Sequence, residues 1–194
     1  MQEELGGWEA FLGVEESEEN YGIYVFMEFF DDNEPEERLK MLAPALSLKE
    51  ELGHPVNVVL AGKVGDEIVE MARKFPVSKI HVKKMDSPQG LLEFLREFIT
   101  ETKPFVMIGD LKGEARELFP YLAQEMDSGY LGGGLYVSLS PEDNKVTVKR
   151  KIYGGLLIET VKNLKDGVQF ITVDTSSFEL PEKGESQDVE VKEW

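Results

Sequence analysis

Short apolar runs alternate with amphipathic stretches along the first two thirds of the chain. The clearest run is residues 105–109 (FVMIG), and apolar residues at helical spacing follow it: Ala115, Leu118, Phe119, Leu122 and Met126. The run predicts a buried parallel strand, and the spacing of three and four residues predicts a helix with one face on the core. Strand, glycine turn and helix make half of a βαβ unit.

The same pattern recurs three times before residue 105. It predicts strands at residues 22–30, 56–61 and 79–82, the first of them in the centre of the sheet. The first helix is expected to start near Pro35 and to end at Gly53. The second should face inward with Ile68, Met71, Ala72 and Phe75, and the third should have Ser87 as its N-cap and Leu91, Phe94, Leu95 and Phe98 inside.

After Gly134 the pattern changes to consecutive strands, predicted at residues 135–140, 145–152, 156–161 and 169–173. The sequence therefore predicts an α/β fold: a three-layer, mostly parallel sheet with helices on both faces, followed by an antiparallel β-meander. The meander would extend that sheet or form a small second one. Val189, Val191 and Trp194 alternate with charged residues, which indicates a last strand that needs a pairing partner.

Composition removes several classes of function. The 194 residues contain 38 acidic and 21 basic side chains, and the net charge of −17 argues against nucleic-acid binding. The absence of cysteine excludes disulfides, cysteine zinc sites and iron–sulfur ligation by this chain. No apolar run approaches the about 20 residues that span a bilayer, so membrane insertion is not expected. The first residues lack the features of a signal peptide, which favours the cytoplasm.

No catalytic set is visible. The two histidines, His54 and His81, lack metal-ligand spacing, so both are interpreted as structural and no metal is expected. There is no G-x-S-x-G elbow, no phosphate-binding P-loop and no G-x-G-x-x-G after any predicted strand.

One candidate anion site lies between the strand at 105–109 and the following helix, where α/β proteins often bind phosphate. Its residues are Gly109, Lys112, Gly113 and Arg116, and they are opposed by Asp110, Glu114 and Glu117. Because the acids outnumber the bases, a tight turn that brings the helix close to the sheet is the favoured interpretation. Residues 132–134 (GGG) are interpreted as a flexible connection into the meander.

The order of these pieces resembles the N-terminal domain of the electron transfer flavoprotein alpha subunit (the FixB family). Residues 148–161 (VKRKIYGGLLIETV) resemble the family segment RPAYGGNLLATV and match it at Arg150, Tyr153, Gly154 and Gly155. Residues 103–134 resemble the family segment that contains GRDLAPRLAARL, although the family's Gly-Arg-Asp is Gly-Glu-Ala at 113–115. The family's Arg-Pro-Gly is likewise replaced by Asp-Thr-Ser-Ser at 174–177. The resemblance covers roughly residues 21–181.

The resemblance implies the adenine nucleotide alpha hydrolase-like arrangement and a division into an acidic arm (1–20), an α/β domain (21–181) and an acidic tail or linker (182–194). It implies a non-catalytic platform that pairs with a beta subunit, or self-associates through the same surface. FAD is expected mainly on a C-terminal domain that these residues do not include. Arg150, Tyr153, Gly154 and Gly155 are expected to be structural or to lie at the interface. An unusually apolar surface on the sheet or meander is the expected mark of that interface.

Two other interpretations remain open. The altered residues at 113–115 and 174–177 suit a diverged interaction protein that acts alone on the same fold. An adenine nucleotide-binding module similar to the universal stress proteins shares this general architecture, but its glycine-rich phosphate loop is not visible after Gly113.

Overall fold

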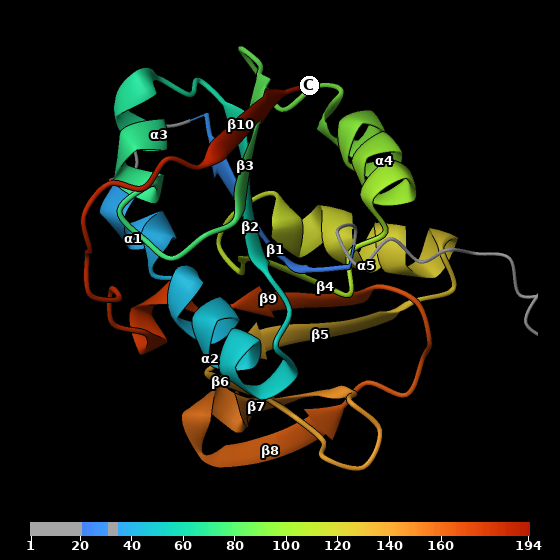
Figure 1. Cartoon of the computed structure of the whole chain (residues 1–194). Helices are drawn as coiled ribbons and strands as arrows, with labels where there is room; N and C mark the ends of the chain where they lie inside the picture. Colours follow the sequence, from blue (N-terminus) through green and yellow to red (C-terminus); the bar gives the residue numbers. More distant parts are fainter. Residues whose placement is uncertain (1–20, 31–34) are drawn as a thin grey trace, which may run out of the picture.

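The computed structural model describes residues 21–30 and 35–194 and contains two sheets (Figure 1). The main sheet has seven strands in the order β10-β3-β2-β1-β4-β9-β5, and every neighbouring pair is parallel. Its strands are β1 (Ile23–Phe29), β2 (Val56–Gly62), β3 (Lys79–Lys84), β4 (Val106–Asp110), β5 (Gly129–Gly134), β9 (Gln169–Val173) and β10 (Glu190–Glu193). The predicted first strand, β1, is the central one.

Helices cover both faces of this sheet, which confirms the predicted three-layer α/β fold (Figure 1). The helices are α1 (Pro35–Leu39), α2 (Leu42–Leu52), α3 (Asp66–Ala72), α4 (Leu91–Thr102) and α5 (Ala115–Glu125). Alternate residues of β1 belong to two separate cores, Val25 and Met27 under α1–α3 and Tyr24 and Phe26 under α4 and α5. A continuous apolar run therefore fills both faces of a central parallel strand.

The antiparallel part forms a small second sheet beside β5 and α2 (Figure 1). Its strands are β6 (Tyr136–Leu139), β7 (Val146–Ile152) and β8 (Leu157–Lys162), with β7 in the middle. The meander prediction was wrong in one respect, because residues 169–173 leave it and insert between β4 and β5 as β9. All five side chains of β9 are buried, as a central parallel strand requires.

Three local predictions were also wrong. Residues 129–134, whose last three glycines were expected to form a flexible connection, make the edge strand β5; a Cβ at Gly134 would lie 3.0 Å from Val148, so the glycine lets the two sheets approach. The first helix is two helices, α1 and α2, although α2 ends as predicted at Gly53 with φ +72°. Ser87 caps no helix, because residues 86–90 form bends and a turn. The residue before α4 is instead Gly90, which has a φ of +85°.

The C-terminal strand was predicted correctly. β10 pairs in parallel with β3, so the alternating residues at the end of the sequence reach a pairing partner. Beyond it, the Trp194 indole Nε1–H donates to Nδ1 of His81 over 3.0 Å, and the indole ring packs against Phe98. The acidic C-terminal stretch is thus held on the edge of the main sheet by hydrogen bonds and by aromatic contact.

Gly109, near the end of β4, permits close packing of α5. A Cβ at this position would lie 2.4 Å from Cβ of Ala115 and 2.9 Å from the ring of Phe119. We expect Gly109→Ala to lower the free energy of unfolding by about 1–3 kcal/mol, the usual cost of overpacking a core. Gly184→Ala is the matched control, because its nearest neighbour is 3.6 Å away. Urea unfolding of both variants measures the difference, and an equal loss in both would contradict this role for Gly109.

Candidate functional site

The carboxyl ends of β1 and β4 form the point where the order of the sheet reverses. From β1 the chain proceeds to β2 and β3 on one side, and β4 then pairs with the other side of β1. Open α/β sheets usually bind ligands at such a point. A cavity of about 430 Å³ opens there, between Glu28 of β1, residues 86–88 after β3 and the first residues of α5.

Three buried ionisable side chains meet beneath this cavity. Nη1 of Arg38, on α1, donates to Oε1 of Glu28 over 2.7 Å and lies 3.5 Å from Oδ2 of Asp110. The backbone N–H of Glu114, at the start of α5, also donates to Oε1 of Glu28 over 3.2 Å. Burial raises the pKa of Glu28, and the positive charge of Arg38 acts in the opposite direction.

The carboxylate of Glu28 fills the space in front of the α5 N-terminus. A Cβ at Gly113 would lie only 1.6 Å from Oε1 of Glu28, so a side chain there would displace the carboxylate. The chain's own acid therefore occupies the place where an α/β protein would hold a phosphate.

The structure brings the four candidate anion-site residues to one end of the sheet but gives them different surroundings. Gly109 packs against α5, and Gly113 makes room for Glu28. Lys112 Nζ lies 3.5 Å from Oδ1 of Asp174, while Arg116 is exposed on the rim of the cavity. Sequence reasoning missed Glu28 and Arg38. A lone acid inside the apolar run at 22–30 was the available signal.

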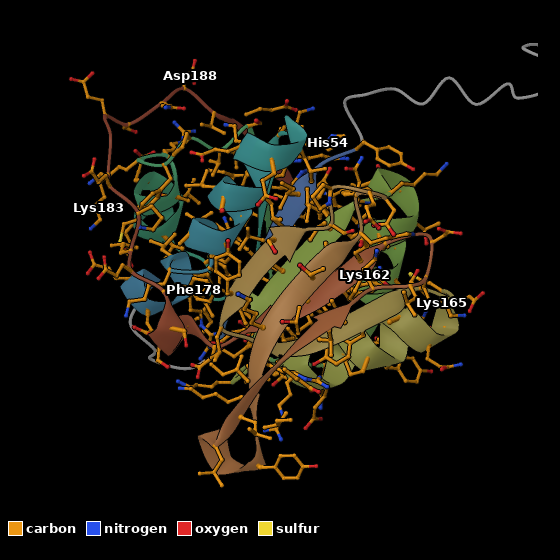
Figure 2. The ribbon with its side chains drawn as sticks, turned by 90° about the horizontal axis from the view of Figure 1, so that it is seen from below. His54, Lys162, Lys165, Phe178, Lys183 and Asp188 are labelled. Carbon is orange, nitrogen blue, oxygen red and sulfur yellow. The ribbon has the colours of Figure 1, made fainter. Side chains whose placement is uncertain are left out.

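A second notable feature is the hairpin made by β7 and β8, with the single 3₁₀ turn Tyr153–Gly155 at its tip. The backbone is left-handed at three successive residues, with φ of +51° at Tyr153, +67° at Gly154 and +92° at Gly155. Glycine adopts this conformation without a steric cost, which suits the two glycines of the turn. Near this turn, Nε of Arg150 on β7 donates to Oε1 of Glu159, its opposite residue on β8, over 2.6 Å. The hairpin tip projects from the body of the molecule (Figure 2).

The hairpin tip is strongly apolar. Tyr153 is 75% exposed and Leu156 is 85% exposed, and Leu157 and Ile158 are also exposed. These four residues are called the hairpin patch below. Exposed apolar side chains gathered on one projecting element mark an interaction surface more often than isolated ones do.

Both histidines lie in packed surroundings. His54 stacks on Phe105, and His81 is buried between Trp194 and Phe98. Burial lowers the pKa of His81 to about 4. Within residues 21–30 and 35–194, no three metal-ligating side chains gather in one place. Over the same residues, every helix is too short or too polar to cross a membrane.

Comparison with known proteins identifies the family. The family model of the electron transfer flavoprotein domain matches residues 35–194, most of the chain. The chain belongs to this family. The resemblance to the N-terminal domain of the alpha subunit is thereby confirmed at family level, and the parallel sheet agrees with it.

Individual relatives are distant. The electron transfer flavoprotein alpha subunit of Megasphaera elsdenii is 24% identical over 89% of this chain and 52% of its own length. The alpha subunit of Clostridium acetobutylicum is 22% identical, over 81% of this chain and 48% of its own length. Subunit LctC of the NAD⁺- and ferredoxin-dependent lactate dehydrogenase of Acetobacterium woodii is 24% identical over 84% of this chain and 40% of its own length. The chain thus spans about half the length of these relatives.

Proposed function

We propose that this chain is the assembly domain of a flavin-based electron-transfer protein and that it pairs with a beta-type subunit. Membership of the electron transfer flavoprotein family, with alpha subunits among the relatives, supports the alpha-type role. The hairpin patch is the main support for pairing with another subunit, because its large apolar side chains are exposed to water at the family's Tyr-Gly-Gly motif.

The hairpin patch has the chemistry of a docking surface. Burying each of its larger side chains against a partner is favourable by about 1.5–3 kcal/mol. β8 hydrogen-bonds only to β7 among the described strands, so its outer edge is also available for contact. The Arg150–Glu159 pair and the left-handed residues at 153–155 fix the shape of the tip, and Arg150 thus acts as a positioning residue.

We propose that FAD binds mainly to the part of an alpha subunit that this chain does not span. The residues present do not fit FAD at the N-terminus of α5, where an α/β protein would hold the diphosphate of a dinucleotide, because the Glu28 carboxylate occupies that place. The same carboxylate argues against the adenine nucleotide alternative. In this proposal the chain positions subunits in the cytoplasm and catalyses no reaction by itself.

Substitution in the hairpin patch tests the pairing. We expect Leu156→Asp, Leu157→Asp to weaken binding to the beta-type subunit of the same genome by about 100-fold or more, since the contacts of two leucines that docking would bury are lost. Leu164→Asp is the matched control, because Leu164 is 84% exposed but lies outside the hairpin. Isothermal titration calorimetry and native mass measure both.

Equal affinity in the two variants would refute docking through the hairpin patch. A chain that binds no beta-type subunit, yet forms a homodimer that the hairpin substitutions dissociate, would support the diverged interaction protein instead. A yellow complex containing both subunits would place the chain in a working flavoprotein.

A further inference from the structure

We propose that the cavity above Glu28 binds a small organic cation, with an N–H group of that cation donating to Oε2 of Glu28. The site lies at the carboxyl ends of β1 and β4, and it shares no residue with the hairpin patch. The proposal goes beyond subunit pairing and does not depend on it.

The strongest observation is an unsatisfied carboxylate oxygen. Glu28 is 2% exposed, and its Oε1 accepts from Arg38 and from the Glu114 backbone. Its Oε2 is buried and has no hydrogen-bond donor among the described residues, and Nε of Arg38 likewise has no acceptor there. A buried polar atom without a partner is costly, and Glu28 lines the cavity, so a ligand whose N–H group reaches this oxygen from the cavity gains free energy on binding.

The charge around the cavity selects a cation. Four carboxylates line it, from Glu28, Asp86, Glu114 and Glu117. Of its three basic side chains, Arg38 is shared between Glu28 and Asp110 and Lys112 lies beside Asp174, which leaves Arg116 as the lining cation with no ion pair in the described part of the chain. Acids therefore prevail, and a phosphate would meet Glu28 at the helix N-terminus.

The cavity also indicates the kind of cation. No cluster of three metal-ligating side chains is present in the described residues, so a metal ion would lack ligands. A volume of about 430 Å³ suits a small molecule, and Phe30 and Pro88 offer apolar contact for an alkyl chain. A primary ammonium or guanidinium compound combines positive charge, N–H donors and an alkyl part.

The test is a ¹⁵N–¹H NMR titration of the full chain with 1,4-diaminobutane at constant ionic strength. We expect saturable shifts, largest at the Glu114 amide, which donates to the same carboxylate. Tetramethylammonium has the charge but no N–H donor and should leave that amide unchanged. Glu28→Gln should weaken diaminobutane binding by about tenfold or more, as the loss of a charge-assisted hydrogen bond implies.

Two further variants keep the proposal open to refutation. Glu117→Gln removes one exposed carboxylate from the rim and should change the affinity less than Glu28→Gln does. Ser87 also lines the cavity but takes no part in the buried ion pair, so Ser87→Trp should occupy the space and abolish binding even if Glu28→Gln does not fold. Equal shifts with tetramethylammonium, or Glu114 shifts produced by inorganic phosphate, would overturn the proposal.

Discussion

Arg38→Met is expected to lower the free energy of unfolding at pH 7.5 by about 3–5 kcal/mol, because it leaves Glu28 and Asp110 buried without their cation. Methionine keeps much of the volume of the arginine stem, so most of the loss reports the missing charge. Arg38 also lowers the pKa of Glu28, which burial already raises. The variant should therefore regain stability as the pH falls towards 5, since the folded state then takes up a proton on Glu28 more readily than the unfolded state.

Urea unfolding of Arg38→Met, with Arg116→Met as control, measures this effect. Arg116 lines the same cavity but is exposed, so its replacement should cost less than about 0.5 kcal/mol. The double variant Glu28→Gln, Arg38→Met should recover a substantial part of the loss, because it removes a buried charge together with its partner. A deficit in Arg38→Met that is the same at pH 7.5 and pH 5 would show that packing, rather than charge, accounts for it.

The parallel core could be read from the sequence because most of its strands are nearly continuous apolar runs and its helices have regular inward spacing. β1, β2 and β4 follow that rule, whereas β3 is a charged segment with a short buried centre at residues 80–82. β9 has the same buried character, yet its place between β4 and β5 depends on a long-range choice between two sheets, which no local pattern encodes. β5 was missed because glycine is rare in strands. Here the glycines leave room for neighbouring side chains: Asn163 lies against Gly129, and Val148 lies against Gly134.

The candidate site shows the same limit more clearly. The glycine turn at 109–113 was found from its position after a strand, but its partner Glu28 lies more than eighty residues earlier. Arg38 lies on a short helix that the sequence pattern merged with the next one. The hairpin motif was recognised from Arg150 and the Tyr-Gly-Gly run, whereas the projection of its apolar tip into solvent emerged only from the fold.

His81 links the C-terminal strand to the pH dependence of stability. Its Nδ1 accepts the Trp194 indole hydrogen, so this ring is neutral when the contact forms. Burial is the main cause of its low pKa of about 4, and Lys192 and Lys79 lower the pKa further, whereas Glu190 and Glu101 raise it. Protonation would both bury a charge and remove the acceptor for Trp194, which loosens β10 at its end.

Stability should consequently fall as the pH drops from 6.5 to 4. In this window the unfolded state protonates His81 at its ordinary pKa of about 6.5, while the folded state does not. The stability that the neutral His81 ring contributes is fully present above pH 6.5, and its loss at lower pH amounts to at most about 3 kcal/mol. Glu28, with its raised pKa, changes stability in the opposite sense over part of the same range.

Comparison of the wild type with His81→Leu by urea unfolding at pH 7.5, 6.5, 5.5 and 4.5 isolates the histidine from Glu28 and the surface acids. The wild type should lose more stability over this range than His81→Leu, by up to about 3 kcal/mol, because leucine takes up no proton in either state. His54→Leu is the matched control, because it replaces the other histidine, which lies partly exposed in the turn after α2 and makes no contact with Trp194 among the aromatic pairs of the described residues. If His81→Leu and the wild type lose stability in parallel, His81 is protonated in the folded state, and the Trp194 contact does not hold its ring neutral.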